Sequence, residues 1–228
     1  MIVNMLRKIL SLLFIFNCSI TFGQSTIQQL FNSEGWELID KYENGSEISV
    51  KSLDGQPLEA VMIANTVPFE ANTLLEIVYD VDKYDEIFLS SQQVSTTVLK
   101  STPRFTDVYQ HLPVPIPFLS DRHYIFRMDT INNSRVAWTL ISYNNTYETF
   151  LKERDDEFNK PVYLVSGYGI WEAINNGDKS CRLSYRVYMD SGGNLPGFLI
   201  EWLNKKALAN IFQDVIVEAS SRSNQLHH

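Results

Sequence analysis

The sequence predicts an α+β fold in which one antiparallel sheet packs against a long C-terminal helix. Three observations support this prediction. Residues 37–67 and 94–190 contain strand-like segments, residues 70–89 have helical spacing, and residues 196–222 form a long amphipathic pattern. With 228 residues, 44% of them hydrophobic and 12% aromatic, the chain is long enough for one domain with a sizeable core.

The C-terminal helix is predicted to have a broad apolar face. Its apolar residues recur every fourth position, with a second row beside them: Leu199, Leu203, Ala207, Ile211, Val215 and Ala219, then Leu208, Phe212 and Ile216. Pro196 suits the first turn, where a missing N–H costs little. A helix of this kind needs a large concave surface to cover its apolar face.

The strands are predicted from alternation and turn signals. Residues 37–50 form a hairpin around Asn44-Gly45, with Leu38, Tyr42, Ile48 and Val50 as inward residues. The other predicted strands span residues 58–67, 94–99, 105–112, 123–130, 135–143, 162–174 and 182–190. Two short helices over residues 70–89, a weak helix over 25–31 and a solvated acidic loop at 155–157 complete the prediction.

Residues 1–23 are predicted to be a cleaved signal peptide. Arg7 and Lys8 precede the short apolar run 9–16, and small residues precede a cut after Gly23. The run is too short to span a bilayer, although an uncleaved anchor and lipidation at Cys18 stay open as alternatives. We therefore expect a secreted or periplasmic protein with a domain over residues 24–222 and a disordered tail at 223–228.

The charge of the mature chain argues against nucleic acid as a partner. Removing two basic and no acidic residues from 19 basic and 27 acidic ones leaves a net charge of −10. Cleavage also leaves Cys181 as the sole cysteine, so no intramolecular disulfide can form.

Catalytic and metal-binding motifs are lacking. The sequence has no glycine-rich phosphate loop, nucleophile elbow or paired-cysteine metal site. His111 and His123 have no helical histidine partner, so no metal or cofactor is predicted. The plausible proton donors for an enzyme are Tyr109, His111, Tyr168 and Tyr185, and their spacing does not favour catalysis.

Three motifs occur in an order that resembles the START family of lipid-binding proteins. The first is a proline-containing loop before a strand, with Pro115, Pro117, Ser120, Asp121, Arg122 and Tyr124. The second is the strand containing Gly169, and the third leads into the last helix with Asp190, Gly193, Leu195 and Pro196. The chain departs from the family at His123, where an acidic residue is common, and at Tyr84, where tryptophan is common.

The resemblance implies a helix-grip fold, like that of START and Bet v 1 proteins, with a tunnel for one apolar molecule under the C-terminal helix. It implies a non-enzymatic monomer that binds a lipid or another hydrophobic small molecule and transfers or senses it. The proline loop and the terminal helix would act as a lid, and transient contact with a membrane is possible. The residues expected to bind the ligand are Tyr109, His111, Arg122, Tyr124, Phe126, Met128, Leu183, Tyr185, Val187, Phe198, Leu199, Trp202 and Phe212. For each residue plain core packing stays open, and Arg122 has a carboxylate such as Asp80 or Asp82 as its alternative partner.

Two other functions stay open. One is a cyclase-like or aromatase-like enzyme on the same scaffold, which would need an acid/base pair inside the cavity. The other is an envelope protein-interaction module whose cavity is filled by its own aromatic side chains.

Overall fold

A computed structural model describes residues 25–90, 94–114, 119–143, 146–158, 160–177, 179–190, 192 and 197–225, with side chains in the last segment from residue 205 onward. The predicted signal peptide and prolines Pro115 and Pro117 lie outside the described residues.

In the described residues, ten strands form one sheet. In chain order they are β1 (Glu37–Lys41), β2 (Glu47–Ser52), β3 (Glu59–Val67), β4 (Ser95–Ser101), β5 (Phe105–Leu112), β6 (Arg122–Asn132), β7 (Arg135–Leu140), β8 (Val162–Tyr163), β9 (Gly167–Asn175) and β10 (Cys181–Met189). The spatial order is β1-β2-β3-β10-β9-β7-β6-β5-β4, and each neighbouring pair is antiparallel. The short strand β8 pairs with β6 in parallel.

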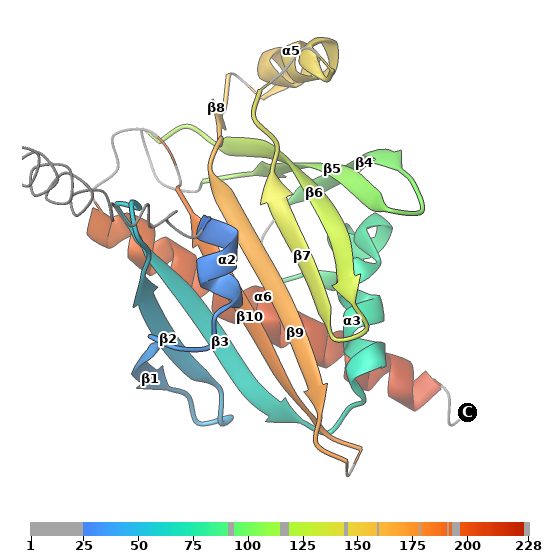
Figure 1. Cartoon of the computed structure of the whole chain (residues 1–228). Coiled ribbons are helices and arrows are strands. Elements are labelled where there is room, and N and C mark those ends of the chain that lie inside the picture. Colours follow the sequence, from blue (N-terminus) through green and yellow to red (C-terminus); the bar gives the residue numbers. More distant parts are fainter. Residues whose placement is uncertain are drawn as a thin grey trace, which may run out of the picture.

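The helices lie on both faces of this curved sheet (Figure 1). They are α2 (Thr26–Phe31), α3 (Ala71–Tyr79), the 3-10 turn η1 (Val81–Lys83), α4 (Tyr84–Ile87), α5 (Glu148–Glu157) and α6 (Gly197–Gln225). The long helix α6 crosses one face, called here the inner face, and α3 packs beside it. Helices α2 and α5 cover parts of the opposite, outer face.

The main hydrophobic core lies between the inner face, α3 and α6. From α6 it takes Leu208, Phe212, Val215 and Ala219, which are spaced by three or four residues. Strand β10 contributes Cys181, Leu183 and Tyr185, and α3 contributes Leu74, Leu75, Ile77 and Val78. This architecture confirms the predicted α+β fold with a sheet around the C-terminal helix.

Three local predictions differ from the structure. Residues 155–157 belong to helix α5 rather than to a loop, because Leu151 anchors an otherwise charged helix on the outer face. The segment predicted as one strand at 162–174 is divided into β8 and β9. Leu38 and Tyr42 are exposed, at 61% and 39%, because the edge strand β1 extends beyond the area that α6 covers.

Helix α6 ends at Gln225, beyond the predicted end at Arg222. Its last turn is tied to the rest of the fold by Arg222, which donates to Glu218 at 2.6 Å and to Asp80 at 3.1 Å. No described helix is both long enough and apolar enough to span a bilayer.

Candidate functional site

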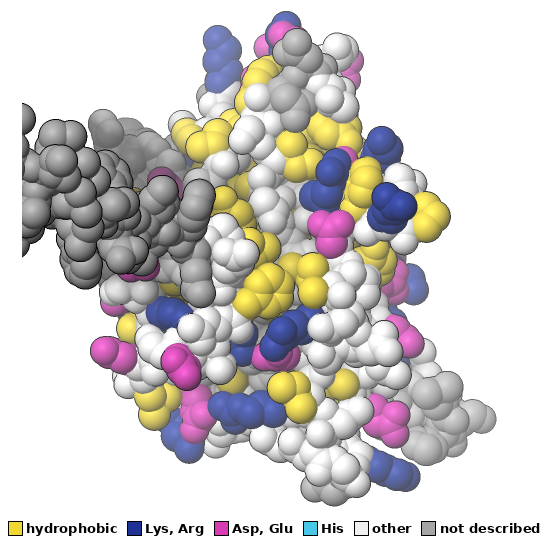
Figure 2. Space-filling model, in the orientation of Figure 1, with side chains coloured by type: hydrophobic (Ala, Val, Ile, Leu, Met, Phe, Trp, Pro, Cys, Tyr) yellow, Lys and Arg dark blue, Asp and Glu magenta, His cyan; other side chains and the backbone are white. Residues whose placement is uncertain are grey.

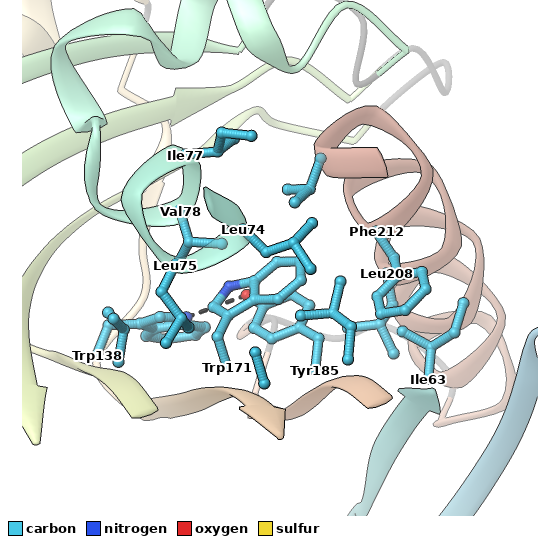
Figure 3. Packing of buried hydrophobic residues seen from close by; sticks show 14 of the residues in the cluster. Ile63, Leu74, Leu75, Ile77, Val78, Trp138, Trp171, Tyr185, Leu208 and Phe212 are labelled. Atoms are coloured by element: carbon cyan, nitrogen blue, oxygen red, sulfur yellow. Dashed lines mark hydrogen bonds between the residues drawn. The ribbon is translucent and has the colours of Figure 1, made fainter. Parts of the chain in front are cut away.

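Four aromatic side chains meet on the inner face, beneath the middle of α6. The rings of Trp171 and Tyr185 stack with centroids 3.9 Å apart and planes 8° apart. The ring of Phe212 lies parallel to Trp171 at 6.0 Å, and the Trp138 indole N–H donates to the Tyr185 hydroxyl at 3.0 Å. Figure 3 shows this group, called here the aromatic wall, between the strands, α3 and α6.

Gly169 makes the position of Trp138 possible. The two residues are directly opposite each other on β9 and β7. A Cβ atom at Gly169 would lie 2.2 Å from the indole of Trp138, which is far inside van der Waals contact. Only glycine therefore leaves room for the indole to lie across β9 and reach Tyr185.

The inner face becomes more accessible toward one end of the sheet. Along β10 the exposed fraction rises from 0% at Leu183 to 6% at Tyr185, and Val187 and Met189 are only half-buried. Strand β6 shows the same trend, from 1% at Met128 through 3% at Phe126 to 8% at Tyr124. This end of the inner face, called here the open end, is where β10 ends at Met189 and β6 begins at Arg122.

The polar groups that face inward near the open end are neutral or paired. The Tyr124 hydroxyl donates to the side-chain oxygen of Gln110 at 2.7 Å, and the Gln110 amide donates to Thr96 at 3.2 Å. Burial raises the pKa of Tyr124 and of Tyr185, so both phenols stay neutral near pH 7. Arg122 is buried and donates to the carbonyl of Ser120, and burial lowers its pKa.

Most of the described residues predicted to bind a ligand do lie on the inner face. Tyr124, Phe126 and Val187 lie toward the open end, whereas Met128, Leu183, Tyr185 and Phe212 are packed in or behind the aromatic wall. The side chains of Phe198, Leu199 and Trp202 lie outside the described part of α6. The carboxylate of Asp80, proposed as a partner of Arg122, instead pairs with Arg222 and Lys83.

Tyr109 and His111, also predicted as ligand-binding residues, face the other way. In β5 the alternation places Val108 and Gln110 inward, so Tyr109 and His111 point to the outer face under α5. The Tyr109 ring packs edge-on against Phe150 at 5.0 Å, and His111 stacks on Phe158 at 3.8 Å. Both residues therefore hold α5 to the sheet, on the face opposite α6.

Asp121 connects the start of β6 to residues at and just beyond the end of β5. Its carboxylate accepts a hydrogen bond from the backbone N–H of Val114 at 2.8 Å and contacts the His111 ring nitrogen Nε2 at 3.1 Å. The sequence places this residue next to Arg122 but gives no sign of which partners it has.

The sequence analysis did not single out Gln110, Trp138, Leu140 or Trp171 as site residues. Their signal was the period-two alternation of β5, β7 and β9, which puts them on the same face as Tyr124 and Tyr185. Among the described residues, no three His, Cys, Asp or Glu side chains are placed to hold a metal ion.

Neither a protein-family model nor a curated protein matches this chain. Solved structures match it closely in fold. A STAR-related lipid transfer protein from Xanthomonas axonopodis is 15% identical, with a TM-score of 0.63 over 82% of this chain and 99% of that one. Human STARD10 is 16% identical, with a TM-score of 0.64 over 89% of this chain and 81% of that one.

The chain has the START-like helix-grip fold. This fold was predicted from the three motifs, and the structural matches confirm it. The Zhui aromatase/cyclase from a Streptomyces species also matches, at 16% identity and a TM-score of 0.53 over 72% of this chain and 94% of that one. The START-like fold is therefore shared by this chain, lipid transfer proteins and an enzyme.

Proposed function

We propose that this protein binds a lipid or another hydrophobic small molecule, without altering it chemically, between the inner face of the sheet and α6. The observation that carries the proposal is the rise in exposure along β6 and β10 toward the open end. Apart from Arg122, which donates to the carbonyl of Ser120, the side chains named there are apolar or uncharged. An apolar ligand would therefore gain free energy from the surface it removes from water, at about 25 cal/mol per Å². The solved START lipid transfer domains with the same fold support this reading.

An enzyme is the second candidate, because an aromatase/cyclase shares the fold. Of the four donors that the sequence offered, Tyr109, His111 and Tyr168 pack on the outer face. Tyr185 faces inward, and its hydroxyl already accepts the Trp138 N–H. The described donors do not converge, which favours a binding protein over a catalyst.

We further propose that the mature chain acts as a secreted or periplasmic monomer that carries or senses its ligand. The proposal rests on the basic and apolar start of the sequence and on the net negative charge. Brief contact with a membrane would then deliver or collect the ligand.

Native mass spectrometry of the protein purified without detergent tests the binding function. We expect a defined mass increment that solvent extraction releases as a lipid. Val187→Trp should abolish the increment, because the larger side chain fills the open end, whereas Ile174→Trp on the exposed outer face of β9 should retain it. An empty protein that takes up no fluorescent fatty acid, sterol or phospholipid would refute the proposal.

A further inference from the structure

We propose that the aromatic wall is the inner end of the binding site and limits the length of the ligand, so that the protein selects single-chain lipids of short or medium length. This inference rests on the proposed binding function. It concerns Trp138, Trp171, Tyr185 and Phe212, which lie between the open end and the packed core.

The wall is held firmly in place. The Trp171 ring lies parallel to the rings of Tyr185 and Phe212, and the Trp138 hydrogen bond ties a third strand to Tyr185. The Trp138 indole occupies the space beside Gly169 that a side chain would fill, since a Cβ atom at residue 169 would overlap the indole. The wall therefore combines side chains from β7, β9, β10 and α6.

The space behind the wall is filled. Leu74 and Val78 of α3 lie there (Figure 3), with Leu183 of β10 and Val215 of α6 in the same core. Each of the four side chains is no more than 1% exposed. A methylene chain that enters at the open end meets close-packed side chains once it reaches the wall. It can advance further only by displacing them, which close packing makes costly.

Phe212 is the member of the wall that comes from α6, so shortening it should lengthen the site between helix and sheet. A matched control is Leu151, a fully buried side chain of α5 that packs on the outer face, away from the aromatic wall. Phe212→Leu removes less volume than Phe212→Ala, so it replaces the alanine variant in the test if the alanine variant does not fold.

The test measures the affinity of saturated fatty acids of about 8 to about 20 carbons by displacement of a fluorescent fatty acid. Each methylene that finds room should tighten binding roughly fourfold, from about 0.8 kcal/mol per buried methylene. In the wild type the affinity should stop rising with chain length once the fatty acid reaches the aromatic wall. In Phe212→Leu and Phe212→Ala it should keep rising for about one to three further carbons, and in Leu151→Ala it should stop rising where it does in the wild type.

The outcomes separate the two proposals. Binding with the same length limit in the wild type and the folded Phe212 variants would refute the proposal that the aromatic wall ends the site. The proposed binding function would still stand. An equal shift in Leu151→Ala would also refute the proposal about the aromatic wall, because the effect would then come from general loosening. No binding at any chain length by the wild type would refute the binding function itself.

Discussion

Gly169 and Trp138 show how one residue controls the inner face of the sheet. The missing side chain at Gly169 admits the indole, and the indole in turn reaches Tyr185. Gly167 is two residues away on the same face of the same strand. A Cβ there would overlap the flexible side chain of Leu140, at 2.9 Å, and would make an ordinary contact with the carbonyl oxygen of Tyr188, at 3.5 Å. The two glycines therefore provide a matched pair.

We expect Gly169→Ala to lower the free energy of unfolding by about 3 kcal/mol, because the new methyl group overlaps a rigid ring. Gly167→Ala should cost clearly less, since the Leu140 side chain can move. Urea unfolding measures both. Adding Trp138→Leu to Gly169→Ala should recover part of the loss, and equal costs at the two glycines would contradict this account.

His123 is a second residue whose environment has a measurable consequence. Its side chain is buried on the outer face between Tyr109, Tyr163 and α5, with Nε2 3.5 Å from Asp155. Burial lowers the pKa of His123 below 6.5, and the neighbouring His111 lowers it further, while the Asp155 carboxylate opposes the shift. The folded protein therefore holds this ring neutral at pH values where the unfolded chain protonates it.

Stability should consequently be highest above pH 6.5 and fall as the pH drops from 6.5 toward the lowered pKa of folded His123. The unfolding free energy of the wild type, measured by urea titration across this range, should fall more steeply than that of His123→Gln. Each unit by which the pKa is lowered corresponds to about 1.4 kcal/mol. Identical slopes in the two proteins would show that His123 does not contribute.

At the scale of elements, the short helix α2 is held by cations that bind its C-terminal carbonyls. Arg186 donates to the carbonyls of Leu30 at 3.2 Å and Phe31 at 3.3 Å, and its other terminal nitrogen donates to Glu172 at 2.6 Å. Lys51 donates to the carbonyl of Gln29 at 2.9 Å. These contacts fix a helix that is too short to be stable alone.

Replacing Arg186 with methionine should destabilise the protein by about 3–5 kcal/mol, because it removes one partner of the buried Glu172 and the donors to α2. Hydrogen exchange should show the loss first in α2. Arg182→Met is the matched control, on the same strand and face, because Arg182 pairs with Glu47 at the surface and should contribute less than about 1 kcal/mol. Similar losses in the two variants would argue against a specific role for Arg186.

Helix α5 illustrates an element that the sequence pattern concealed. Among its residues only Leu151 is buried, and the surface ion pairs Lys152–Glu148 and Arg154–Glu157 run along its exposed side. A helix with so few apolar residues has no clear periodicity. Its Leu151 and Phe150 pack against Tyr109 and Ile125, which come from distant strands.

At the scale of the whole molecule, the packing of α6 on the sheet brings together the N-terminal strands and the C-terminal helix. Strand β10 pairs with β3 on one side and β9 on the other, and α6 then packs on β3 and β10. The inner face therefore forms only when the N-terminal strands and the last helix come together. Figure 2 shows charged side chains of both signs over the outer face, where α2 and α5 lie.

The sequence by itself determined the fold class and the order of most elements. Alternation in β10 and the four-residue spacing in α6 are local signals, and residues such as Leu183 and Phe212 lie in the core that these patterns predict. The START-like motifs added the helix-grip arrangement, which depends on the order of elements along the chain.

Only the tertiary structure decided which face each strand residue occupies and which part of the inner face is filled. A strand with two covered faces, such as β5, buries almost every residue, so its sequence cannot show that Gln110 points toward α6 while Tyr109 and His111 point toward α5. The aromatic wall depends on register between β7, β9 and β10 and on a helix more than 20 residues further along the chain. Such contacts depend on which strands pair and in which register, and local periodicity in the sequence does not predict either.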